Sequence, residues 1–325
     1  MALKVIEYRQ LVQILALFMI VQFGGLLLST LVFNNSTYQQ VQSAQVISSP
    51  ASAVFYIAYI VFFSVLLLLI LKFYKGIFRL VEGLVIFIAS FEVFLIIGMY
   101  LNSSVSISIF GSAVPLSLLF AVVLAILFVV AKNKWPNLKN TAAIVASIGV
   151  GVILGVGFSF TVAFIFMVIL AVYDFIAVFV TKHMITLANA VSEKNLAFMV
   201  DVKELEAVSK SNFSSKELKA YRMEMRKAKI SNPAFKTAVS RGLVPVSASV
   251  ALGTGDLAMP LMVAVSAFKV YLSFTFSMFI AFGAIIGLVL TMLILKRFKR
   301  ALPAIPPLLF GIIIGILLYY AYLVL

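Results

Sequence analysis

Two aspartates stand inside long apolar stretches, far from one another in the sequence. Asp174 lies within Ala171–Phe175, and Asp256 ends the string Gly253-Thr254-Gly255-Asp256. A carboxylate at bilayer depth is costly, so each is a candidate functional residue. Two carboxyls held close together in a low-dielectric site cannot both ionise, and they share a proton. One member then activates a water while the other donates a proton to the developing oxyanion, which is the chemistry of peptide-bond hydrolysis.

The two glycines before Asp256 have a physical interpretation of their own. Gly253 and Gly255 permit either a close approach of helices or an irregular backbone beside the carboxylate. Irregular backbone at membrane depth is tolerated only where it lines a cavity. Paired glycines in membrane helices are also typical of plain packing, so both interpretations stand.

Two further carboxylates fall within apolar stretches. Glu82 lies close to Arg79 near one end of its stretch, and we expect it to snorkel or to pair there. Glu92 is deeper and has no base nearby, which leaves a functional role or burial as a hydrogen-bonded neutral acid.

Other hydrolytic chemistries lack their residues. The single histidine, His183, excludes a two-histidine zinc helix, and it lies at a helix end rather than beside a membrane serine. The chain has no cysteine, which excludes thiolate nucleophiles and cysteine-based zinc sites. We therefore expect neither a metal nor another cofactor.

The elements that must position these residues are predicted to be membrane helices. The chain is 64% hydrophobic and 11% charged, with a mean hydropathy of +1.18, so lipid is the solvent for most of it. Its 325 residues leave room for about nine spans of roughly 20 residues. We predict an all-α membrane protein with spans near residues 11–33, 52–73, 77–100, 110–131, 141–157, 159–182, 243–266, 270–295 and 303–325.

The basic residues give these spans an orientation. All but one of the 25 lysines and arginines lie in alternate connections, and Lys269 is the exception. The positive-inside rule then places the N-terminus and the loop at about 184–242 in the cytoplasm, and the C-terminus outside. The net charge of +14 is explained by this topology, and we expect no nucleic-acid partner. Within the loop, residues 216–230 predict a basic helix on the inner leaflet or a solvated segment.

Three motifs, in order, resemble a known family. Tyr173-Asp174 in one span and Gly253-Thr254-Gly255-Asp256 in the next are similar to the two signatures of the presenilin and signal peptide peptidase superfamily. The third signature, Pro-Ala-Leu-Pro, is present with isoleucine in place of leucine as Pro303-Ala304-Ile305-Pro306. Over residues 1–160 the resemblance extends only to the number of spans.

The resemblance implies a presenilin-like fold and an intramembrane aspartyl protease. It makes Asp174 and Asp256 catalytic, with Tyr173, Gly253 and Gly255 as active-site support. Pro303, Ala304 and Ile305 would dock substrate, although Pro near a first turn is equally typical of a plain helix start. An inner 184–242 loop matches the presenilin orientation, which implies type I transmembrane substrates. We expect the protein to resemble the microbial relatives that act without partner subunits. This resemblance implies a multi-pass protein of the cell membrane, and it leaves open whether the protein forms a homo-oligomer.

The same interpretation divides the chain in two. Residues 1–160 form a scaffold of helices one to five, and residues 161–325 form the catalytic helices six to nine with the 184–242 loop. The rival function is a proton- or cation-coupled transporter or channel, because intramembrane carboxylates also serve as proton relays. A non-catalytic membrane scaffold would leave the two costly aspartates unexplained.

Overall fold

The computed structural model describes residues 8–34, 77–101, 106–109, 112–180, 197–209, 243–271, 273–298 and 302–324. Two of the predicted features, the span at 52–73 and the basic helix at 216–230, lie outside these residues. The described part is mostly helical. Its long helices are α1 (Tyr8–Phe33), α4 (Ile77–Leu101), α5 (Leu116–Lys134), α6 (Lys139–Gly157), α7 (Phe160–Phe175), α11 (Thr254–Tyr271), α12 (Phe274–Phe298) and α13 (Ile305–Val324).

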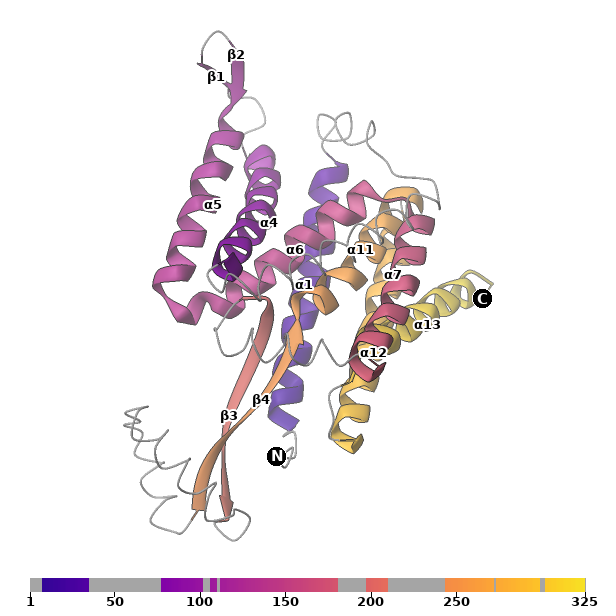
Figure 1. The fold of residues 1–325 in the computed structure, drawn as a ribbon. Coiled ribbons are helices and arrows are strands. Elements are labelled where there is room, and N and C mark those ends of the chain that lie inside the picture. Colours follow the sequence, from indigo (N-terminus) through magenta and orange to yellow (C-terminus); the bar gives the residue numbers. More distant parts are fainter. Residues whose placement is uncertain are drawn as a thin grey trace.

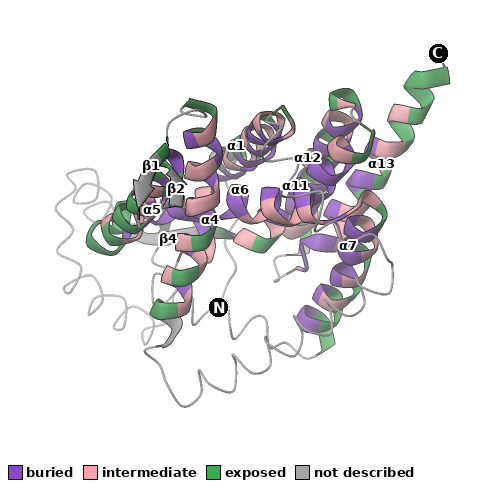
Figure 2. Cartoon of the chain, turned by 90° about the horizontal axis from the view of Figure 1, so that it is seen from above, coloured by how far each residue is buried: buried purple, intermediate pink, exposed green. Residues whose placement is uncertain are grey.

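The helices form a bundle with three parts (Figure 1). The pair α4 and α5 lies on one side, and α7, α12 and α13 gather on the other, with α1, α6 and α11 between them. Side chains buried in the bundle concentrate on the central helices, whereas the outer faces of α5 and the end of α13 are exposed (Figure 2). The exposed positions of α5 are large and apolar, among them Phe120, Val123 and Leu127. Such a surface fits lipid rather than water.

Two short antiparallel hairpins interrupt the helices, so the all-α prediction was wrong in this respect. Strands β1 (Ser106–Ile109) and β2 (Ser112–Pro115) join α4 to α5, where the predicted span at 110–131 had already begun. Strands β3 (Met199–Ser209) and β4 (Leu243–Gly253) pair from Met199↔Gly253 to Ser209↔Leu243. This longer ribbon projects from the bundle at the end where α1 begins (Figure 1).

The predicted span at 243–266 is therefore divided between a strand and a helix. Its first eleven residues form β4, and the helix begins only at Thr254. Seven helices of the described part are long and apolar enough to cross a membrane, which supports a multi-pass membrane protein. Helix α11, which carries Asp256 and Lys269, is not one of the seven. The count of nine spans and the orientation of the termini stay predictions.

Helix α11 is the best-buried helix of the bundle. Its residues from Pro260 to Ala267 are all buried, which is expected of a helix surrounded by others. Glycines of α6 allow the close packing: a Cβ on Gly155 would lie 2.6 Å from the Cβ of Val265, and one on Gly151 would lie 2.7 Å from Leu261 Cδ2. Small residues at helix contacts are typical of membrane bundles.

Polar contacts tie α6 to both ends of α11. The Ser147 hydroxyl shares its one proton between the Ala143 carbonyl of its own helix, at 2.7 Å, and the Thr254 carbonyl, at 3.2 Å. Lys269 Nζ donates to the Val156 carbonyl at 2.6 Å. Lys269, the one basic residue that broke the charge pattern, thus binds a carbonyl in the last turn of α6, where a cation is favourable. These contacts and the glycine packing hold α11 in one position.

Candidate active site

Asp174 is placed at the end of a helix that changes its winding. It is the last residue but one of α7, and the next turn, Ile176–Val180, is a π-helix. Single π-turns are frequent at functional sites. The side chain is buried, with 4% of its surface exposed. Its Oδ2 accepts a hydrogen bond of 3.2 Å from the backbone N–H of Ile305, and the backbone of Ala304 also hydrogen-bonds the carboxyl.

The donors that reach Asp174 belong to the start of α13. Ile305 is the first residue of that helix, and Pro306 and Pro307 follow it without N–H groups. The backbone groups of Ala304 and Ile305, the last ones before the two prolines, therefore both bond to the Asp174 carboxyl. A helix N-terminus also favours negative charge. Asp174 thus acts as a cap for α13, supplied by a residue distant in sequence.

Asp256 lies near the start of α11, much as Asp174 lies beside the start of α13. It is the third residue of that helix, which begins directly after β4 ends at Gly253, and it is partly buried. The backbone of Gly253 hydrogen-bonds its carboxyl, and a Cβ added to Gly253 would lie 3.1 Å from Asp256 Oδ2. The absence of a side chain at Gly253 thus leaves room for the carboxylate. The irregular backbone expected here is the change from strand to helix.

The fold brings the two aspartates together. Helix α7 packs against both α11 and α13, and the Asp256 carboxyl interacts electrostatically with that of Asp174. Asp174 lies beside the N-terminus of α13, and Asp256 lies in the first turn of α11. The helix dipole therefore stabilises negative charge on both carboxyls. The described residues hold no group of three histidine, cysteine, aspartate or glutamate side chains that could bind a metal.

The segment Pro303–Ile305 lies beside Asp174, and its three residues are buried. Pro303 and Ala304 precede α13, and only Ile305 belongs to that helix, which has Pro306 and Pro307 in its first turn. An apolar cavity of about 190 Å³ opens next to it, lined by Phe175 and Phe179 on one side and by Thr291 and Pro303 among others. Neither aspartate lines this cavity.

The remaining predicted support residues, Tyr173 and Gly255, differ in their surroundings, and the Tyr173 side chain interacts electrostatically with Asp174. Tyr173 is next to Asp174 and is only partly buried. Gly255 is exposed, and a Cβ there would meet no atom within 4 Å, so a close helix approach at this position was the wrong interpretation. The close approaches to α11 are made by Gly151 and Gly155 of α6 instead.

Two residues near Asp256 were missed in the sequence. Pro260 lies within α11, four residues after Asp256, and a proline there cannot donate the helix hydrogen bond to the Asp256 carbonyl. Gln22 of α1 is fully buried, and its Nε2 donates to the Leu257 carbonyl at 2.9 Å. The proline was visible in the sequence as a break in the helix, whereas nothing in the sequence pointed to Gln22.

Comparison with known proteins agrees with this geometry. Residues 15–323 match the family described as signal-peptide peptidase, presenilin aspartyl protease. The fold is similar to a presenilin-family intramembrane aspartate protease solved in space group C222, with TM-score 0.60, 20% identity and coverage of 96% of this chain and 99% of the other. A structure of such a protease in space group P2 has TM-score 0.58, 21% identity and coverage of 95% and 96%. No curated relative matches the sequence at a significant level.

The fold and the site define a class: a multi-pass membrane protein with two interacting carboxyls on neighbouring helices of its bundle. Because the match covers nearly the whole chain, the protein belongs to the signal-peptide peptidase and presenilin family of aspartyl proteases. It is accordingly an intramembrane aspartic endopeptidase, as predicted from the motifs. The transporter alternative finds no support in these comparisons.

Proposed function

We propose that Asp174 and Asp256 are the catalytic pair and that they cleave peptide bonds within transmembrane segments of other proteins. The observation that carries the proposal is the interaction of the two carboxyls, one from α7 and one from α11, which are helices that pack against each other in a membrane bundle. Among the described residues, both receive backbone hydrogen bonds and neither has a salt bridge. A pair without a cation can hold one shared proton, which is the protonation state that the chemistry needs.

The reaction follows from that shared proton. The ionised carboxyl takes a proton from a water, whose oxygen bonds to the carbonyl carbon, while the protonated carboxyl donates to the carbonyl oxygen. In the second step the carbon–nitrogen bond breaks, and a proton passes to the leaving amine. The titration belongs to the pair, so we assign these roles to the dyad and not to single residues.

The Pro303–Ile305 segment is proposed to dock the substrate beside the pair. Because the N–H groups of Ala304 and Ile305 are directed to Asp174, they are not free donors for a substrate strand in this conformation. Docking and the position of the Asp174 carboxyl are therefore coupled: a substrate that takes these donors must move or release the carboxyl. The neighbouring apolar cavity beside Pro303 is of a size for a single apolar side chain of the substrate.

The topology proposed from the basic residues sets the substrate orientation. With the N-terminus and the β3–β4 ribbon on the cytoplasmic side, substrates are type I segments whose N-termini lie outside. A synthetic single-span reporter in liposomes tests both proposals. We expect cleavage by the wild-type protein, and none by Asp174→Asn or Asp256→Asn at equal amounts of folded protein. Equal cleavage of a reporter inserted in the reverse orientation would contradict the type I assignment alone.

A further inference from the structure

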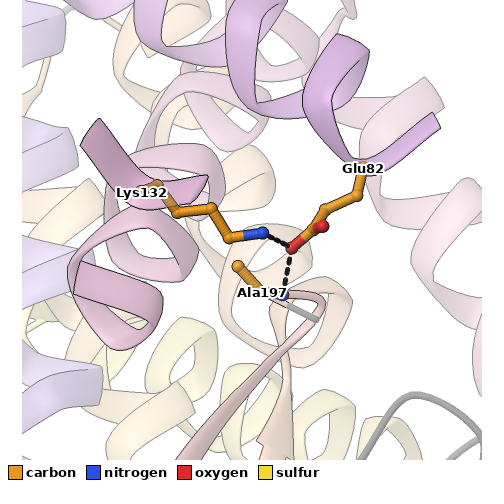
Figure 3. Close-up of polar contacts among 3 residues, drawn as sticks. All are labelled: Glu82, Lys132 and Ala197. Carbon is orange, nitrogen blue, oxygen red and sulfur yellow. Dashed lines mark hydrogen bonds and ion pairs between the residues drawn. The ribbon is translucent and has the colours of Figure 1, made fainter. Parts of the chain in front are cut away.

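A second buried carboxylate lies away from the catalytic pair (Figure 3). Glu82 of α4 is 1% exposed, and Lys132 in the last turn of α5 is 8% exposed. Glu82 Oε1 accepts from Lys132 Nζ and also, at 2.5 Å, from the backbone N–H of Ala197. One carboxylate oxygen thus joins three segments that are distant in sequence. Of the two expectations for Glu82, snorkelling or pairing, the structure shows pairing, and the partner is Lys132 rather than Arg79.

Stability alone does not account for a charge pair in this place. Two apolar side chains of similar volume commonly stabilise a protein as well as a buried ion pair does, because desolvation of both charges opposes their attraction. The additional hydrogen bond to Ala197 is what an apolar pair could not supply. A charged acceptor makes such a bond stronger and better defined in direction. The feature to explain is therefore the fixed position of Ala197.

Ala197 lies just before β3, and its neighbour connects directly to α11. The Phe198 carbonyl accepts from the Thr254 backbone N–H at 3.0 Å and from Thr254 Oγ1 at 3.2 Å. Thr254 is the first residue of α11, two residues before Asp256. In the next step of the ladder, Met199 pairs with Gly253, whose backbone hydrogen-bonds the Asp256 carboxyl.

We propose that the Glu82–Lys132 pair is a positioning device that holds Ala197 and Phe198, and through them the Thr254–Asp256 turn, at the depth where Asp256 meets Asp174. Lys132 orients the carboxylate, Glu82 holds the start of β3, and Phe198 holds the start of α11. Neither Glu82 nor Lys132 touches the reacting atoms. The inference rests on the proposed function, since it assigns Asp256 to the reaction.

The first test compares two double variants of the full chain. Glu82→Met/Lys132→Met removes both charges, and Glu82→Lys/Lys132→Glu keeps an ion pair but puts at position 82 a side chain that cannot accept from Ala197. We expect both variants to lose kcat by about ten- to a hundredfold on a single-span reporter, because small misplacements of reacting groups have effects of that order. KM should change by less than about twofold, since the docking segment is untouched.

Thermal unfolding separates positioning from simple support of the fold. We expect the exchanged pair to unfold near the wild-type temperature while its kcat stays low. A wild-type kcat in the Met/Met variant would overturn the proposal. So would recovery of kcat together with stability in the exchanged variant, because the ion pair alone would then suffice. Arg79→Met, which removes an exposed charge one turn away on α4, is the matched control and should leave kcat unchanged.

A double-mutant cycle built from two milder substitutions tests the connection between Glu82 and α11, and it does not depend on the Met/Met and Lys/Glu variants above. Glu82→Gln weakens the charged acceptor, and Thr254→Val removes the side-chain bond to Phe198 while keeping its backbone bond. If both act through Phe198, their effects on kcat are less than additive, whereas independent effects add and would contradict the connection. Loss of cleavage in Asp256→Asn is measured beside them. Normal cleavage by Asp256→Asn would contradict the catalytic assignment itself. Loss of cleavage in Asp256→Asn together with wild-type kcat in the Glu82 variants would contradict only the positioning role of Glu82.

Discussion

Two buried carboxylate sites in this bundle are stabilised in opposite ways. Glu82 is paired with a lysine and accepts one backbone N–H, so its charge is neutralised in place. Asp174 accepts backbone N–H groups from the start of α13, and its charged neighbour is a second carboxyl, Asp256. The first arrangement gives a fixed ion pair. In the proposed mechanism the second arrangement holds one shared proton that is available for reaction.

The contrast explains why buried charge alone does not identify an active site. Both sites hold a carboxylate that is at most 4% exposed, in helices of the same membrane bundle. What separates them is the partner: a cation suits a structural or positioning role, and a second carboxyl suits acid–base chemistry. Substitutions that remove one partner should therefore abolish the chemistry without loss of stability at the aspartate pair, and should lower stability together with the positioning of Asp256 at the lysine pair.

The largest expected effect is at the aspartate pair. Asp174→Asn and Asp256→Asn should each lower cleavage by about a thousandfold or more, since general acid and base catalysis are both lost. The unfolding temperature should stay the same or rise, because an acid that is costly to bury becomes a neutral amide. Reporter cleavage and thermal unfolding of the same preparations measure both. A loss of activity that only follows a loss of folded protein would contradict the contrast.

The next effect is on stability at the lysine pair. Lys132→Met leaves Glu82 buried without its cation, and we expect a loss of about 3 kcal/mol in the free energy of unfolding. Glu82→Met/Lys132→Met should recover most of that loss, since no unpaired charge remains. Unfolding by denaturant in detergent micelles compares the two proteins. Equal stability of the single and double variants would show that the pair is not buried in the working protein.

A smaller effect is expected where α6 packs on α11. Gly155→Ala places a Cβ 2.6 Å from Val265 Cβ and 2.9 Å from the Met262 carbonyl, so one helix must move. We expect a loss of about 1–3 kcal/mol in stability, together with lower activity because α11 carries Asp256. Gly157→Ala, on the same helix but with no atom within 4 Å of the new Cβ, is the matched control. Similar losses in both would argue against close packing as the cause.

The smallest effect concerns the hydrogen bond from α6 to the start of α11. Ser147→Ala removes a donor that the Thr254 carbonyl shares with the Ala143 carbonyl of α6, and it should lower stability by about 1 kcal/mol, with a modest fall in kcat. Ser90→Ala is its control, because the Ser90 hydroxyl bonds to the Phe87 carbonyl of its own helix. The comparison is made by unfolding and kcat on both proteins. A greater loss of kcat in Ser90→Ala would contradict a specific role for Ser147.

The helices and the aspartate pair could be predicted from the sequence because their signals are local or strong. Apolar runs predict spans, and a carboxylate in such a run is conspicuous. The β3–β4 ribbon was missed although its strands alternate, as in Val200, Asp201, Val202 and Lys203. The apolar run from 243 onward was interpreted as one helix, and its β-branched alternation was the signal that could have corrected this.

The positions of Glu82 and Asp174 in their networks depend on contacts across the fold. Lys132 is 50 residues from Glu82, and Ala197 is 115 residues from it. Because α4 and α5 are antiparallel neighbours, the start of α4 lies near the end of α5, and the pairing of Glu82 with Lys132 could have been predicted. The contact of Glu82 with the start of β3 could not. Likewise the motif Pro303–Ile305 was recognised, whereas its role as donor to Asp174 needed the packing of α13 on α7.

Binding of a hydroxyethylene transition-state analogue tests the central claim most directly, because its hydroxyl must be received by both carboxyls at once. The analogue is titrated against wild-type protein, Asp174→Asn and Asp256→Asn in the same detergent, and each dissociation constant is measured. We expect tight binding to the wild type and affinity lower by about a hundredfold or more in each variant. Equal affinity for all three proteins would mean that Asp174 and Asp256 do not act together on a substrate.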